Sequence, residues 1–180
     1  VQYVRGNPAK ADTLRQACIE DARGALVLAQ NQLDARSDHT SLAILLTIET
    51  IKKDVFTVAE LVDNNNREFF ERTGCDAIVC LSGFTTHIMV QELLDPGVQG
   101  VINQLTSTDY GQQIFVAPME ATGKVSFEDV RQWARKVNAL LVGYERDGWT
   151  EVNPDHDAHL EPGDKLVLIA TKRPPSFTGK

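Results

Sequence analysis

The sequence predicts an α/β protein with a partial Rossmann-like parallel sheet, a helix-turn-helix crossover and a small α+β C-terminal lobe. Up to about residue 83, short apolar runs without apolar/polar alternation are separated by helical patterns, which is typical of parallel strands covered on both faces. Two consecutive helical patterns follow, and a helix among hairpin-prone strands occupies the rest. The expected domains are therefore residues 1–83, 84–110 and 111–180.

Composition and charge narrow the class of protein. The 180 residues are 42% hydrophobic, enough for one large domain or two small ones. A net charge of -7 with scattered cations argues against nucleic-acid binding. Three cysteines without CxxC spacing are typical of reduced thiols in a cytosolic protein. No run approaches the roughly 18 apolar residues that cross a bilayer, and no signal-peptide pattern opens the sequence, so we expect a soluble chain.

The first domain is read from four apolar runs of strand length, at residues 1–4, 25–29, 55–59 and 77–80. Helical patterns separate them at residues 11–18, 37–52 and 64–73. The pattern over 37–52 is apolar around most of its circumference, which predicts a helix buried on more than one side.

The crossover consists of two predicted helices separated by Asp95-Pro96-Gly97, a turn that neither helix can continue through. Each helix carries an apolar stripe, and exposing both on a monomer would be costly. We therefore expect the stripes to form a dimer contact, through Met89, Leu93, Leu94, Val98, Val101 and Ile102. In the alternative interpretation, both helices simply pack on their own domain.

After a polar hinge at residues 106–111, the C-terminal lobe begins with a strand at 114–116. A helix over 127–137 follows, with Ser126 as its N-cap and Asp129 at the third helical position. Arg146-Asp147-Gly148 then predicts the turn of a β-hairpin, and a last strand spans 165–170.

Several phrases, in this order along the chain, resemble the RCK (KTN, Trk-type) family over essentially its whole length. They are Gly6-Asn7-Pro8, Asp21-Ala22-Arg23-Gly24-Ala25, Gly74-Cys75-Asp76-Ala77-Ile78-Val79, Leu94-Asp95-Pro96-Gly97-Val98 and Leu160-Glu161-Pro162-Gly163-Asp164. The resemblance implies a cytoplasmic regulatory domain that senses a ligand for a potassium channel or transporter.

The resemblance also implies a sheet with strands that this sequence does not contain. In the family, a strand, a GxGxxG turn, a helix, a second strand and a second helix come first, and sheet order 3-2-1-4-5-6 would leave the run at residues 1–5 without a neighbour. We therefore expect the chain to be part of a longer protein that supplies the first two strands and a pore. Alternatively, another chain completes the sheet, or the sheet is rebuilt.

Ligands of open α/β sheets bind at the carboxyl ends of the strands. The candidate ligand-binding residues at those ends are Gly6, Asn7, Ala29, Gln30, Asn31, Glu60 and Asp63. The resemblance implies an adenine nucleotide or Ca²⁺ as the ligand, and Glu60 matches a family carboxylate. Ala29 and Val62 stand at the partner positions and are not carboxylates, which favours a structural role for Glu60.

Two further groups of side chains are candidate metal ligands. Asp34 and Asp38 accompany Glu60 in the first domain, and His156 and His159 lie in the Asp155-His156-Asp157-Ala158-His159 cluster. The ordinary interpretation of that cluster is a solvated loop before the last strand.

The function predicted is a gating domain of a potassium channel, coupling cation or nucleotide binding to pore opening. No nucleophile and base stand at recognisable spacing, so we expect no enzymatic activity. The partners expected are a second copy, in a dimer or an octameric ring, and a membrane pore domain. The alternatives are a soluble Trk-type subunit of a potassium transporter and a fragment of an NAD-dependent oxidoreductase.

Overall fold

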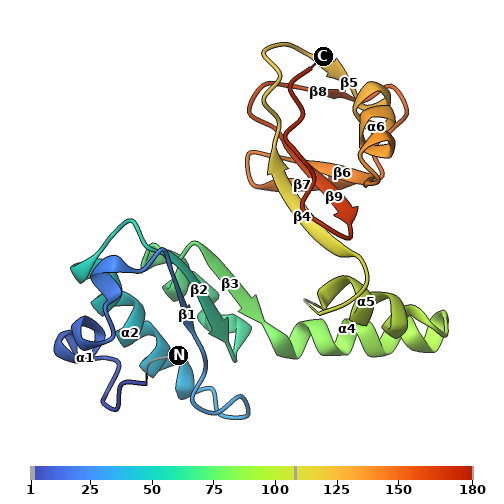
Figure 1. Cartoon of the computed structure of the whole chain (residues 1–180). Coiled ribbons are helices and arrows are strands. Elements are labelled where there is room, and N and C mark those ends of the chain that lie inside the picture. Colours follow the sequence, from blue (N-terminus) through green and yellow to red (C-terminus); the bar gives the residue numbers. More distant parts are fainter. Residues whose placement is uncertain (1–2, 108, 180) are drawn as a thin grey trace. The chain divides into compact units, whose positions relative to one another are not determined.

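The computed structural model describes residues 3–107 and 109–179 of the chain. The chain divides into two compact units, Val1–Leu93 and Leu94–Lys180 (Figure 1). Each unit has a hydrophobic core of its own.

The first unit is built on a three-stranded parallel sheet. Its strands are β1 (Gly24–Val27), β2 (Phe56–Leu61) and β3 (Ala77–Cys80), in the order β1-β2-β3. In this register Val27 pairs with Ala59, and Leu61 pairs with Cys80. Helix α2 (Ser37–Ile51) connects the first two strands, and η2 (Asn64–Asn66) with α3 (Arg67–Arg72) connects the second and third. The predicted parallel α/β class is confirmed.

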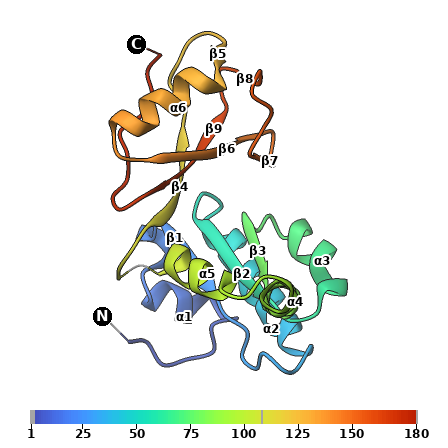
Figure 2. The same cartoon turned by 90° about the vertical axis from the view of Figure 1, so that its right-hand side faces the viewer.

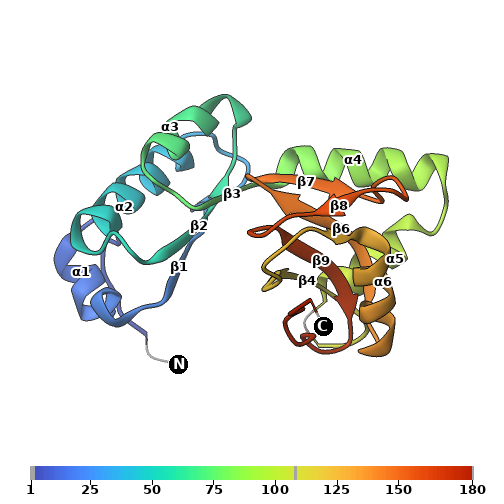
Figure 3. The ribbon, with the colours of Figure 1, turned by 90° about the horizontal axis from the view of Figure 1, so that it is seen from above.

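Helices α1 (Ala11–Gln16), α2 and α3 pack on one face of this sheet, and η1 (Ile19–Asp21) follows α1 (Figure 3). The core between them is apolar and buried, and consists of Leu14, Ile19, Val27, Ile44, Leu45, Ile48, Val55, Ala59, Leu61 and Phe70. Alternate side chains of a strand point to opposite faces. Leu26 and Val79 therefore lie on the other face, where both are exposed.

The strand expected at the start of the chain is not found in the described residues. Val1 and Gln2 lie outside them, and Tyr3 to Arg5 form no strand. A strand is stabilised by the ladder it shares with a neighbour, and the only partner of β1 among the described strands is β2. The Gly6-Asn7-Pro8 turn does lead into a helix, as predicted, with the Lys10 N–H donating to the Asn7 carbonyl at 3.0 Å.

Two helices follow the sheet, in agreement with the sequence. Helix α4 (Leu81–Leu94) begins directly after β3, and α5 (Val98–Thr106) begins after the Asp95-Pro96-Gly97 break. Gly97 has a φ of 111°, a left-handed conformation that glycine adopts without a Cβ clash.

The second unit is an α+β domain around an antiparallel sheet of order β4-β9-β6-β7 (Figure 2). Its strands are β4 (Gln113–Pro118), β6 (Leu140–Arg146), β7 (Trp149–Val152) and β9 (Lys165–Ala170), and β5 (Val125–Ser126) pairs separately with β8 (His159–Leu160). Helix α6 (Phe127–Lys136) buries Phe127, Val130 and Ala134 against a core that includes Leu141, Leu160 and Leu168.

Two local predictions in this unit are confirmed. The Ser126 hydroxyl oxygen accepts a hydrogen bond from the Asp129 N–H at 3.1 Å, so Ser126 caps α6. Asp147 and Gly148 have φ values of 51° and 80°, the two positive φ angles of a type I′ turn, between strands that pair antiparallel.

Candidate functional site

The carboxyl ends of β1 and β2 and the start of α2 meet at one edge of the parallel sheet. This is the place where open α/β sheets bind ligands. The residues of this edge come from the loop after β1, from the end of β2 and from the first turn of α2, and they include Ala29, Gln30, Asn31, Ser37, Asp38, Glu60 and Asp63. We call it the carboxyl edge.

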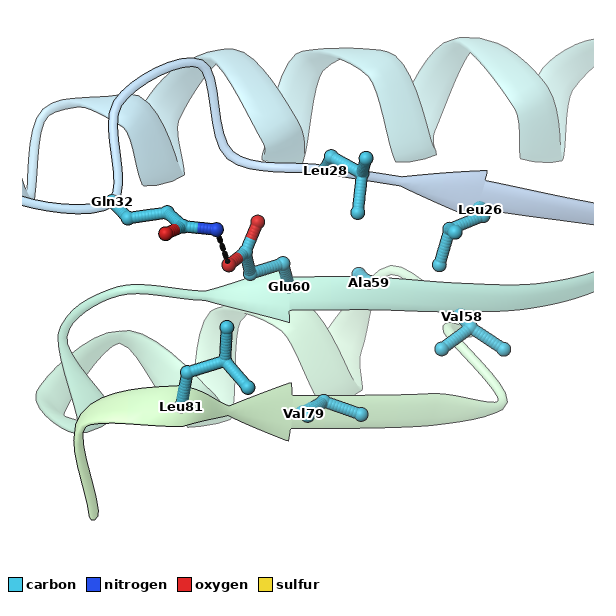
Figure 4. A pocket seen from close by; sticks show the side chains of 8 residues that line it. All are labelled: Leu26, Leu28, Gln32, Val58, Ala59, Glu60, Val79 and Leu81. Atoms are coloured by element: carbon cyan, nitrogen blue, oxygen red, sulfur yellow. Dashed lines mark hydrogen bonds between the residues drawn. The ribbon is translucent and has the colours of Figure 1, made fainter. Parts of the chain in front are cut away.

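Glu60 is buried at the carboxyl edge, with 6% of its surface exposed. Its Oε2 accepts a hydrogen bond from the Ala29 N–H at 2.9 Å, and its Oε1 accepts one from Gln32 Nε2 at 2.8 Å (Figure 4). Both donors belong to the loop after β1. The carboxylate therefore ties that loop to β2.

Asp38 fixes the loop after β2 in a similar way. It is fully buried, and its oxygens accept from the Val62 N–H at 2.9 Å, the Asp63 N–H at 3.0 Å and Asn66 Nδ2 at 2.8 Å. Three donors to one carboxylate are enough to satisfy a buried anion without a cation. Asp63 in turn caps η2 by accepting from the Asn65 N–H at 3.0 Å.

Ser37 closes the loop after β1 onto α2. Its hydroxyl donates to the Asn31 carbonyl at 2.9 Å and accepts from the Asn31 N–H at 3.0 Å. Both loops of the carboxyl edge are thus held by side chains of neighbouring elements.

Three hollows border this edge. A groove of about 210 Å³ is lined by Leu26, Leu28, Gln32, Val58, Ala59, Glu60, Val79 and Leu81 (Figure 4). A second of about 580 Å³ contains Asn7 and Gln30, and a third of about 460 Å³ contains Gln30, Asn31 and Asp34. The structure therefore brings Asn7 and Gln30 to one cavity, while Glu60 lines a different one.

The predicted metal ligands are not gathered at one point. Asp34 pairs with Arg36, whose Nη2 lies 2.9 Å from Asp34 Oδ2, and hydrogen bonds from Arg36 hold the pKa of the Asp34 carboxyl below its usual value. Within residues 3–107 and 109–179, no group of three or more His, Cys, Asp or Glu side chains is arranged to hold a metal ion. This includes His156 and His159 of the second unit.

Sequence reasoning missed an ion pair in the second unit between the half-exposed Arg146 and the buried Asp164. Arg146 donates from Nε and Nη2 to the two carboxylate oxygens of Asp164, at 2.8 and 2.7 Å, and also from Nη2 to the His159 carbonyl at 3.0 Å. Asp164 also accepts from the Glu161 N–H at 2.7 Å. The signal was present in the Pro162-Gly163-Asp164 turn, but its partner lies 18 positions earlier.

The apolar stripes of the crossover are largely open to solvent. Neither α4 nor α5 has a buried residue. Met89, Leu93, Leu94 and Val101 are exposed, and Val98 and Ile102 are half-buried. Among the described residues, no helix is long and apolar enough to span a bilayer.

The parallel sheet and its carboxyl edge define a Rossmann-like fold in the first unit, and α4, α5 and the α+β unit follow it along the chain. Residues 1–81 match the TrkA-N domain family. Over this segment, 81 of the 180 residues, the chain resembles TrkA-N (RCK) domains.

Relatives of the chain include proteins that are named as ion channels. The calcium-gated potassium channel TvoK of Thermoplasma volcanium is 22% identical over 179 residues, which cover 96% of this chain and 51% of TvoK. The probable ion channel POLLUX of Arabidopsis thaliana is 24% identical over 171 residues, or 92% of this chain and 20% of POLLUX. The chain thus spans about half or less of the length of these relatives.

A solved structure shares the fold. The human SLO3 gating ring is 17% identical to this chain and superposes with a TM-score of 0.69. The match covers 93% of this chain and 35% of the SLO3 chain. This likeness extends over both units and confirms the fold class.

Proposed function

We propose that the chain is a cytoplasmic gating domain of a potassium channel, in which ligand binding at the carboxyl edge changes the probability that the pore is open. The observation that carries the proposal is the similarity to ion channels over 92–96% of the chain, together with the TrkA-N match. This similarity favours a channel domain over a fragment of an oxidoreductase, because the relatives are named as channels and not as oxidoreductases.

The ligand we propose is a cation or an adenine nucleotide. The name of TvoK supports calcium as one candidate. The cavity that contains Asn7 and Gln30 is also lined by Thr40 and by the apolar Pro8, Leu28 and Ile44, and this mixture of polar and apolar side chains suits a ribose or an adenine. Ligand binding can shift a gating equilibrium only if the two states bind the ligand with different affinity.

The assembly we propose is a homo-oligomer joined through the crossover. Residues 1–83 are the sensing lobe, residues 84–110 the dimer element and residues 111–180 the C-terminal lobe. The exposed apolar side chains of α4 and α5 support this arrangement, because burying them between copies removes apolar surface from water.

The test is potassium flux through vesicles that contain the complete channel assembly, measured with and without Ca²⁺ and with and without adenine nucleotides. We expect at least one of these ligands to change the flux. Changing both Gln30 and Asn31 to Ala should weaken that response while flux without ligand is retained. Loss of the response in a matched Gln16→Ala variant on α1, or flux that no ligand changes in the wild type, would contradict the proposal.

A further inference from the structure

The Glu60 carboxylate lies where water cannot solvate it freely. Besides Glu60 itself, the groove around it is lined by apolar side chains and a single polar one, that of Gln32. Figure 4 shows Leu26, Leu28 and Val79 along its walls. A buried carboxylate without partners is strongly unfavourable, so Glu60 requires either a cation or N–H donors.

The donors that Glu60 receives come from one loop. The Ala29 N–H is a fixed backbone group, whereas the Gln32 amide is the tip of a side chain whose residue is otherwise exposed. Each donor bonds a different oxygen of the carboxylate, the Ala29 N–H to Oε2 and the Gln32 amide to Oε1. Removing the Gln32 amide would leave one oxygen facing the groove.

We propose that the Gln32 side-chain amide is an intramolecular substitute for a cation at Glu60, and that this clasp positions the loop after β1 without a metal. Gln32 and Glu60 are then positioning residues of the carboxyl edge. A cation reaches Glu60 only after the amide leaves, so Gln32 decides what kind of ligand this end of the groove accepts. The relevance of this inference to ligand sensing rests on the proposed function. The hydrogen bond between Gln32 and Glu60 does not depend on that function.

The clasp has an isosteric test, because Gln and Glu are nearly the same size. Gln32→Glu sets two carboxylates against each other, so the loop should be released. The double variant Gln32→Glu with Glu60→Gln exchanges the two groups, which lets an amide at position 60 donate to a carboxylate at position 32. Hydrogen exchange of the Ala29 amide, measured by NMR on the whole chain, reports whether the Glu60 carboxylate still holds the loop after β1.

We expect the Ala29 amide to exchange at least about tenfold faster in the Gln32→Glu variant, since hydrogen bonds to charged groups are among the strongest. In the double variant, the exchange rate of the Ala29 amide should return to within about threefold of the wild-type rate, because the hydrogen bond between positions 32 and 60 is formed again. Calcium chloride should restore protection in Gln32→Glu and leave the wild type unchanged. Gln30→Glu adds the same charge two positions away and should leave Ala29 protected.

Two results would overturn the inference. One is an Ala29 amide that exchanges at the wild-type rate in Gln32→Glu. The other is a calcium-induced change at Ala29 in the wild type that Glu60→Gln abolishes, because Glu60 would then bind the cation itself. Neither measurement involves a pore, so failure of the clasp and failure of the gating function are separate outcomes.

Discussion

Asp164 is a buried carboxylate of the second unit that is paired with Arg146. It is 2% exposed, and this burial by itself disfavours the charged form. The hydrogen bonds from Arg146 and from the Glu161 N–H outweigh burial, so the pKa of Asp164 lies below its ordinary value of 3.8. The pair joins β6 to the turn before β9.

The lowered pKa predicts acid sensitivity of this unit. A carboxyl whose pKa is lower in the folded state stabilises the fold above its unfolded pKa, and that contribution disappears as the pH falls through the folded pKa. Asp164→Asn should cost about 2–4 kcal/mol of unfolding free energy at pH 7, because Arg146 loses its buried partner. The variant should also lose less stability than the wild type when the pH falls from 5 to 3. Urea unfolding followed by tryptophan fluorescence measures both.

Asp157→Asn is the matched control, since Asp157 is an exposed carboxylate in the same unit. It should leave unfolding near the wild-type value at pH 7. Parallel pH profiles for Asp164→Asn and the wild type would show that the ion pair does not cause the acid sensitivity.

At the scale of elements, the local sequence pattern was sufficient to predict those helices and turns whose conformation is set by their own residues. The helix predicted over 37–52 is α2, Ser37–Ile51, because its apolar residues recur at helical spacing. The Asp147-Gly148 turn was predictable because its two positive φ angles are specific to a few residue types. The run at the start of the chain failed as a strand, since a strand needs a neighbour that no local pattern reveals.

The crossover helices yield a prediction about association. Leu93 lies on α4 with 82% of its surface exposed. If the stripe is a dimer contact, Leu93→Asp places a charge in an apolar interface and should shift the chain toward monomer, with at least about a tenfold weaker dimer. Sedimentation equilibrium over a range of concentrations measures the change.

Leu33 provides the control for this prediction, as a leucine that is 96% exposed in the loop after β1. Leu33→Asp adds the same charge and should leave the association constant unchanged. An equal effect of the two substitutions, or none from Leu93→Asp, would argue against an interface at the stripe.

At the scale of the whole molecule, two separate cores predict two separable unfolding transitions. Ile48 is 2% exposed in the core of the first unit, and both tryptophans, Trp133 and Trp149, belong to the second. Ile48→Ala should destabilise the first unit by about 2–5 kcal/mol. Far-UV circular dichroism should then show an earlier transition, while the fluorescence midpoint stays where it is.

Leu168→Ala is the converse variant, because Leu168 is buried in the core of the second unit. It should lower the fluorescence midpoint. If Ile48→Ala shifts both signals together, the two units unfold as one cooperative body.

The position of the strand ends at one edge of the sheet was predictable from the sequence, but the contacts of the residues at that edge were not. The rule that ligands bind at the carboxyl ends of parallel strands located Ala29, Asn31 and Glu60 at one edge. Gln32 was missed although it lies next to that set, because its partner is 28 positions away. Asp38 was predicted as a metal ligand, and the structure surrounds it with N–H donors from residues 62, 63 and 66.

The sequence by itself determined the order and type of most elements, the parallel sheet of the first unit and the resemblance of residues 1–81 to TrkA-N domains, because these depend on periodicity, turn chemistry and local phrases. Only the tertiary structure decided which carboxylates accept hydrogen bonds from protein donors. Hydrogen-bond partners such as Gln32 and Glu60, or Arg146 and Asp164, are fixed by how strands and loops come together in space. The spacing of residues along the chain does not reveal which distant residues come into contact.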